Sequence, residues 1–79
     1  MPGKTICIAP KGLFRVVGVD LFSHGDYFMG DHAQVVAFRV ADEHNKRRKE
    51  PMDDVYYVYN DEGTLVRDQS AVSQIGVSP

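Results

Sequence analysis

The stretch LFRVVGVDLFSHGDYFMGDH, residues 13–32, largely decides the fold of this chain. Its first half, residues 13–22, is rich in Val and Phe, which is typical of a β-strand. Ser, His, Gly and Asp at residues 23–26 predict a turn, and residues 27–30 predict a short returning strand. Gly18 stands in the middle of the long strand, and there it indicates either a bulge or a close approach to the backbone.

After this stretch the spacing of apolar residues changes from a period of two to a period of about 3.6. The change predicts one helix of about 14–16 residues, which begins after Asp31 and ends near residues 46–49. We expect Asp31 to cap the first turn and Gln34 to reach back to it, because the sequence Asp-His-Ala-Gln matches a capping box. Four basic residues and Pro51 fit the end of this helix. The expected core face consists of Ala33, Val36, Ala37, Val40, Ala41 and His44.

Further strands are predicted on both sides of this unit. Residues 4–9 form a β-branched run, and the Pro-Lys-Gly turn after it places Gly12 in the left-handed position. Residues 54–59 are the most strand-like run, and a turn at 60–63 leads to a return strand at 64–68. The order strand, strand, strand, helix, strand, strand predicts an α+β fold. We expect a two-layer sandwich, with one α-helix packed on an antiparallel sheet of four or five strands.

Composition and charge describe an ordinary small globular domain. The chain has 79 residues, of which 43% are hydrophobic and 25% charged, and it is too short to form a second core. We expect a single domain over residues 1–68. Residues 69–79 are expected to form a weakly ordered C-terminal tail, with a short strand near residues 75–77 at most. The net charge of −2 provides no general attraction to phosphate backbones or anionic membranes.

Two features predict a cytoplasmic protein. The chain has no apolar run long enough for a signal peptide or a membrane span. Its single cysteine, Cys7, cannot form an internal disulfide, which favours a reducing compartment.

The sequence offers no convincing catalytic residues. Cys7 stands among apolar residues, where a thiol is usually inert. Ser23 and His24 are adjacent in sequence, which does not produce the geometry of a nucleophile and its base. With no catalytic motif present, we do not expect an enzyme.

Four potential metal ligands lie at residues 24–32, where His and Asp flank a glycine at each end. The intervening strand would separate the two pairs by roughly 10 Å, at about 3.3 Å per residue. A turn followed by a helix cap explains the same residues better, so we predict neither a metal nor a cofactor, and a metal site is the weakest of three hypotheses. The ligands in question are His24, Asp26, Asp31 and His32.

The leading hypothesis is a small non-catalytic domain that binds protein, and two observations favour self-association. Val35 and Phe38 lie on the side of the predicted helix opposite its core face, where they would form an apolar patch with a charged rim. The strand at residues 13–22 is apolar on both alternating sets, although one helix covers only one face of a sheet. Homodimerisation through the helix back face or the uncovered sheet face would cover this exposed apolar surface.

The alternative hypothesis is a nucleic-acid-binding module. Arg47 and Arg48 belong to a basic cluster at the end of the predicted helix. Tyr57 and Tyr59 lie on the same face of the strand at 54–59, and aromatic side chains on an open sheet can stack on bases. The chain lacks the signature of an RNA-recognition module, and the helix dipole also accounts for the basic cluster.

Overall fold

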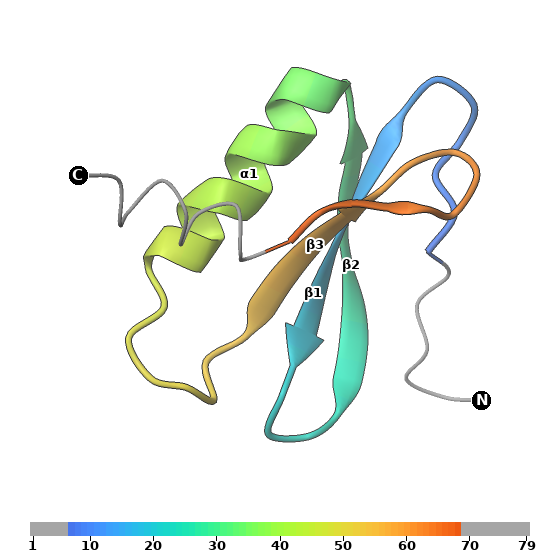
Figure 1. Ribbon diagram of the computed structural model, residues 1–79. Helices are drawn as coiled ribbons and strands as arrows, with labels where there is room; N and C mark the ends of the chain where they lie inside the picture. Colours follow the sequence, from blue (N-terminus) through green and yellow to red (C-terminus); the bar gives the residue numbers. More distant parts are fainter. Residues whose placement is uncertain (1–6, 69–79) are drawn as a thin grey trace.

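Residues 7–68 are described by the computed structural model, in which one helix packs on a four-stranded antiparallel sheet (Figure 1). The α+β fold predicted from sequence is therefore confirmed. The strand order across the sheet is β2-β1-β3-β4, which the sequence left open. The expected tail at residues 69–79, and the short strand near 75–77 within it, lie outside the described residues. The elements are β1 (Phe14–Asp20), β2 (Gly25–His32), α1 (Gln34–Lys46), β3 (Val55–Tyr59) and β4 (Leu65–Arg67).

The segment before β1 differs from the prediction. Residues 7–9, the described part of the expected strand 4–9, do not form a strand, because both edges of β1 are already paired with β2 and β3. The N–H of Ala9 instead donates to the carbonyl of Asn60 at 3.1 Å, next to the β3–β4 turn. Gly12 has a φ of +81°, as the turn prediction requires, and its N–H donates to the Asp61 carboxylate at 2.9 Å.

The centre of β1 explains Gly18. A Cβ atom at this position would lie 2.5 Å from Cζ of Tyr27, whose ring therefore lies directly against the backbone of β1. This is the close approach that the sequence indicated as one of two possibilities. The bulge lies elsewhere: Val16 pairs with Gly30 whereas Val17 pairs with Phe28, so β2 has one extra residue there.

The core lies between α1 and the sheet. Because strand residues alternate between faces, every second residue of β1 and β3 points toward the helix. Alanines on the helix allow its backbone to approach these strand residues closely, and the four central side chains have no exposed surface. Val36, Val40 and His44 of the predicted core face are only half-buried, and Ala33 is exposed. The central four are Val16, Ala37, Ala41 and Val58.

The start of α1 corrects the capping prediction. The strand β2 continues through His32, the N-cap is Ala33, and no side chain caps the first turn. Asp31 lies opposite Arg15 in the β1–β2 register, and its carboxylate accepts two hydrogen bonds from that guanidinium, at 2.8 and 3.0 Å. A charge-assisted bidentate pair is stronger than a single capping bond, which favours the extended conformation.

The C-terminal end of α1 is attached to β3 by Asn45. Its side-chain amide donates to the carbonyl of Tyr56 at 2.9 Å, and its carbonyl accepts the N–H of Tyr56 at 2.9 Å. The two groups of Tyr56 are available because the described part of β4 pairs only with Val58 and Tyr59. Asn45 thus occupies the place of a neighbouring strand.

Among the described residues, no helix is long and apolar enough to cross a membrane.

Candidate functional site

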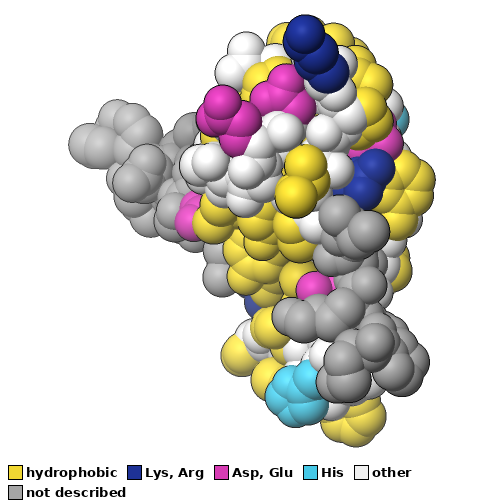
Figure 2. All heavy atoms as spheres, turned by 90° about the vertical axis from the view of Figure 1, so that its right-hand side faces the viewer, with side chains coloured by type: hydrophobic (Ala, Val, Ile, Leu, Met, Phe, Trp, Pro, Cys, Tyr) yellow, Lys and Arg dark blue, Asp and Glu magenta, His cyan; other side chains and the backbone are white. Residues whose placement is uncertain are grey.

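The face of the sheet that points away from α1, here called the open face, is the candidate interaction surface. Figure 2 shows this side of the molecule, with hydrophobic side chains gathered along its middle. Val16 and Val58 point to the helix, so their strand neighbours Val17 and Tyr57 point to the open face, where they are paired in the register. The face comprises Arg15, Val17 and Val19 of β1, Asp26, Phe28 and Asp31 of β2, Val55, Tyr57 and Tyr59 of β3, and Leu65 of β4.

The open face is buried at its centre and exposed toward its edges. Val17 is only 1% exposed, whereas Phe28 is 54% and Leu65 44% exposed. Within residues 7–68, no second layer of helix or strand covers this face. At the end near residues 7–9, burial and the neighbouring Cys7 raise the pKa of Tyr59 to about 12. Large apolar side chains that remain exposed beside a buried centre are typical of surfaces that contact other proteins.

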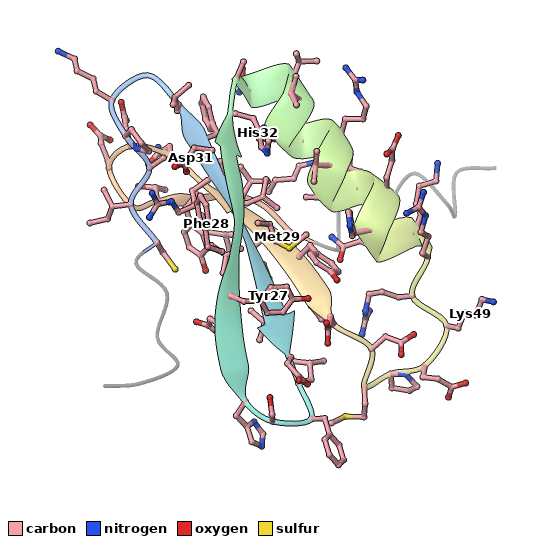
Figure 3. The ribbon with its side chains drawn as sticks, turned by 180° about the vertical axis from the view of Figure 1, so that it is seen from behind. Tyr27, Phe28, Met29, Asp31, His32 and Lys49 are labelled. Atoms are coloured by element: carbon pink, nitrogen blue, oxygen red, sulfur yellow. The ribbon has the colours of Figure 1, made fainter. Side chains whose placement is uncertain are left out.

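Arg15 and Asp31 on the open face are paired with each other, and Asp26 is the third charged residue of this face. The Arg15–Asp31 ion pair is mostly buried, and the hydrogen bond that Arg15 donates to this carboxylate is the main cause that raises the pKa of Arg15. The same guanidinium lies 4.9 Å from the centre of the Phe28 ring, a cation–π contact. Figure 3 shows Phe28 and Asp31 on the same side of β2. This pairing leaves the surroundings of Phe28 without an uncompensated charge from either residue.

The predicted apolar patch on the helix does not form, because the structure separates its two residues. Val35 is 68% exposed near the start of α1. Phe38, predicted to lie on the solvent side, instead packs against the core, and its ring meets Phe14 edge-on with centres 6.2 Å apart. The guanidinium of Arg67 lies over the Phe38 ring, 4.8 Å from the ring centre. The helix therefore buries a wider stripe than its alanines indicate.

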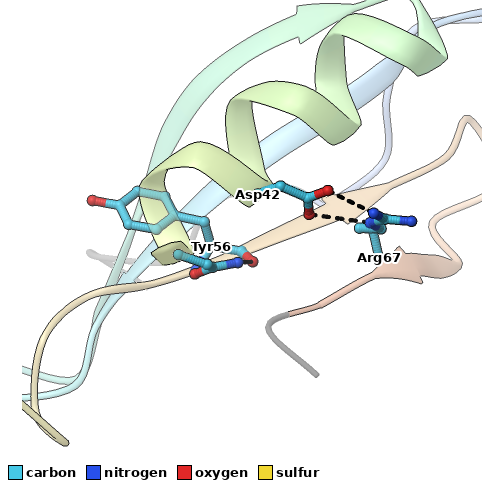
Figure 4. Close-up of polar contacts among 4 residues, drawn as sticks. Asp42, Tyr56 and Arg67 are labelled. Atoms are coloured by element: carbon cyan, nitrogen blue, oxygen red, sulfur yellow. Dashed lines mark hydrogen bonds and ion pairs between the residues drawn. The ribbon is translucent and has the colours of Figure 1, made fainter. Parts of the chain in front are cut away.

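Arg67 comes from β4, whose contribution could not be read from the helix pattern alone. Its guanidinium makes a two-point ion pair with Asp42 of α1, in which Nε donates to Oδ1 at 3.1 Å (Figure 4). The hydrogen bond to Asp42 is the main cause that raises the pKa of Arg67. This ion pair holds the Arg67 side chain over Phe38, so Phe38 does not belong to an exposed patch on the helix.

The residues proposed for nucleic-acid binding are also separated. Tyr57 and Tyr59 lie on the open face, whereas Arg47 and Arg48 line a pocket on the helix side. Arg48 is engaged in shaping the loop after α1, since its guanidinium donates to the carbonyls of Pro51 at 2.9 Å and Asp53 at 3.2 Å. The loop is further closed by Asp53, which accepts the N–H groups of residues 49 and 50; these bonds lower the pKa of its carboxyl.

The candidate metal ligands at residues 24–32 do not converge. Consecutive residues of a strand point to opposite faces, so Asp31 lies on the open face and His32 on the helix side, as Figure 3 shows. His24 is in the turn before β2 and has a φ of +61°. In the described part of the chain, no three His, Cys, Asp or Glu side chains are grouped so that they could hold a metal ion.

A pocket at one end of the molecule, here called the end pocket, has no counterpart among the sequence predictions. It is shallow, has a volume of about 530 Å³, and lies between the β1–β2 turn and the loop that follows α1. Phe22, which the sequence assigned to a strand, is in the turn at its rim and is 82% exposed. The turn is held by Asp20, whose pKa is lowered by hydrogen bonds from the Ser23 side chain and from backbone N–H groups.

Two tyrosines and an aspartate form a hydrogen-bonded chain at the end pocket. The Tyr27 hydroxyl donates to Oδ2 of Asp54 at 2.6 Å and lies 3.0 Å from the Tyr56 hydroxyl. Burial, followed by the bond to Asp54, raises the pKa of Tyr27 well above its ordinary value. The His44 ring lies 4.7 Å from the Tyr56 ring, between centres. The chain crosses β1 only because Gly18 leaves room for the Tyr27 ring.

Comparison with protein-family models, with curated proteins and with solved structures finds no match to this chain.

Proposed function

We propose that this protein is a small, non-catalytic interaction domain of the cytoplasm that self-associates through the open face. The observation that carries the proposal is the exposed ring of Phe28, on a sheet face that lacks a second layer within residues 7–68. A domain of this size buries only about 60–65% of its unfolded surface, so covering a second sheet face contributes much to its stability. The lone Cys7 supports the choice of compartment.

A second copy of the chain is the occupant that best fits this face. Around a two-fold axis each copy presents the same patch, so the apolar side chains of one copy meet those of the other, and a charge that is paired within its own copy needs no partner across the interface. The Arg15–Asp31 pair supplies this internal compensation beside Phe28. Two sheets stacked face to face bury such side chains in a layer about 10 Å thick.

The oligomeric mass in solution tests this proposal. We expect light scattering to give twice the chain mass of 8.8 kDa, and Phe28→Asp to reduce it to the mass of one chain. An aspartate there would be desolvated in the dimer next to Asp26 and Asp31, which costs several kcal/mol. Val35→Asp is the matched control: it adds the same charge at an exposed apolar position on α1, and the dimer should persist.

Three results would contradict self-association through the open face. They are a wild-type mass of one chain at every concentration, a Phe28→Asp dimer, and a loss of the dimer in Val35→Asp that equals the loss in Phe28→Asp. Phe28→Ser serves as a second variant, with circular dichroism to verify that each protein is folded.

Nucleic-acid binding has less support than it had from sequence. Its two halves, Arg47 with Arg48 and Tyr57 with Tyr59, lie on different sides of the sheet and do not form one surface. In addition, Arg48 is engaged with carbonyls of its own loop.

A further inference from the structure

We propose that the end pocket binds the guanidinium group of an arginine side chain presented by a partner protein. The site lies on the helix side of the sheet, so the inference is independent of self-association through the open face. It rests on the direction of the hydrogen bonds among Tyr27, Tyr56 and Asp54 and on the tautomer of His44. It also rests on two other sites in this fold, where an arginine contacts both an aspartate and an aromatic ring.

The tyrosine chain has only one possible direction. Tyr27 donates its single hydroxyl proton to the Asp54 carboxylate, at 2.6 Å. The contact of 3.0 Å between the two hydroxyls therefore requires Tyr56 to donate to the oxygen of Tyr27. Both protons of the chain are directed toward Asp54, and the Tyr56 oxygen retains only lone pairs for a ligand. Figure 3 shows Tyr27 extending from β2 across the helix side of the sheet.

Two further polar residues that line the pocket, His44 and Asp54, also offer acceptors. Nδ1 of His44 lies 2.9 Å from the carbonyl of Val40, which can only accept, so Nδ1 bears a proton, and in this tautomer of the imidazole Nε2 is the acceptor. The second carboxylate oxygen of Asp54, Oδ1, has no hydrogen bond within residues 7–68. Three residues that line one pocket thus present acceptors to it, and they call for a ligand rich in N–H donors.

The cations of the pocket do not meet this need. The Arg48 guanidinium is directed to the carbonyls of Pro51 and Asp53 in its own loop. The side chain of Arg47, just after α1, is exposed and makes no hydrogen bond or ion pair within the described residues. Because Arg47 alone would favour an anion, the experiment below includes an anionic probe.

At two other sites in this chain a carboxylate lies near an aromatic ring, and an arginine side chain contacts both. Arg15 combines the Asp31 carboxylate with the Phe28 ring, and Arg67 combines Asp42 with Phe38. In both cases a guanidinium is bound by a carboxylate on one side and an aromatic ring 4.8 to 4.9 Å away on the other. The end pocket combines Asp54 with the rings of Tyr56 and Phe22. A planar guanidinium suits this combination better than a lysine ammonium does, since it can both stack and donate in its plane.

The binding test uses the full chain and N-acetyl-L-arginine methylamide as the probe, with heteronuclear NMR as the readout. We expect saturable shifts of the amide signals of Phe22, Asp54 and Tyr56. Asp54→Asn, which keeps an acceptor for Tyr27 but removes the charge, should weaken binding about tenfold or more. Glu62→Gln removes the same charge from the β3–β4 turn, at the other end of β3, and should leave the affinity unchanged.

The controls make the inference falsifiable. It is overturned if N-acetyl-L-norleucine methylamide causes the same shifts, if sodium acetate moves these signals in place of the arginine probe, or if Asp54→Asn binds as well as wild type. Should Asp54→Asn fail to fold, Tyr56→Phe replaces it: it removes one acceptor, keeps the ring, and should weaken binding several-fold. Phe28→Asp should bind the probe normally, so failure here and failure of self-association are distinguishable.

Discussion

The two faces of the sheet use the same strands in opposite ways. On the helix side, small aliphatic side chains such as Val16 and Ala41 are completely buried. On the open face, the ring of Phe28 and the side chain of Leu65 remain about half exposed at the edges. Both faces also contain an arginine that pairs with an aspartate over a phenylalanine ring, Arg67 on the helix side and Arg15 on the open face.

This difference separates stability from recognition. Small residues let a helix and a sheet approach closely, and a packed layer of this kind provides most of the stability of a small domain. Larger side chains left partly exposed contribute less to folding, but they can bury more surface against a partner. The comparison between the faces can be tested by removing one contact at a time.

The largest effect is expected in the core of the helix side. Val58→Ala removes two methyl groups from a side chain with no exposed surface, and it should lower the free energy of unfolding by about 2–3 kcal/mol. In the single chain, Leu65→Ala on the open face should lower it by less than about 1 kcal/mol, because half of the side chain contacts solvent there; Phe28→Asp, which prevents the proposed self-association, is therefore the background for both variants. Urea denaturation of both variants measures the difference, and equal losses would contradict the division between the faces.

A smaller loss is expected where the helix is attached to β3. Asn45→Ala leaves the N–H and the carbonyl of Tyr56 without the partner they have in the wild type, and it should cost about 2 kcal/mol. Glu43→Ala, at an exposed position on the same helix, should change stability by less than about 0.5 kcal/mol. If both variants unfold at the same urea concentration, Asn45 does not act as a substitute for a strand.

The smallest effect concerns the covered end of the open face. The pKa of Tyr59 is about 12 in the folded protein and 10.0 ordinarily, so the fold favours its neutral form. This contribution is complete below about pH 10, and it is lost as the pH rises through the interval up to about 12. The free energy of unfolding of Tyr59→Phe should therefore decrease less steeply with pH in that interval than that of the wild type. Tyrosinate absorbance and circular dichroism along one alkaline titration provide the measurement, and a slope unchanged by the substitution would contradict this environment.

Much of the fold could be predicted because it depends on local pattern. The change from period two to period 3.6 marks the helix, and alternating Val and aromatic residues mark β1 and β3. The close approach at Gly18 was also one of two expectations. The capping prediction at Asp31 was wrong because a residue 16 positions earlier, Arg15, binds the same carboxylate. Local sequence contains no information about such a competitor.

The candidate sites were less predictable for the same reason. Phe38 lies off the alanine stripe of its helix, and only Arg67, 29 residues further along the chain, encloses it against the core. The end pocket joins the β1–β2 turn to the end of α1 and the loop after it, which lie more than 20 residues further along the chain. The sequence assigned Phe22 to a strand, whereas Phe22 lies in the turn that Asp20 holds with hydrogen bonds from backbone N–H groups.

The sequence by itself determined the types of the elements from β1 to β4, the single helix and the apolar character of β1 on both sides, because these follow from residue propensity and spacing along a short stretch of chain. The tertiary structure alone decided the strand order, the partner of each charged residue, and which apolar face the helix covers. Ion pairs, tyrosine hydroxyl bonds and burial depend on groups brought together from distant parts of the chain, and pattern along the chain does not specify which of them meet.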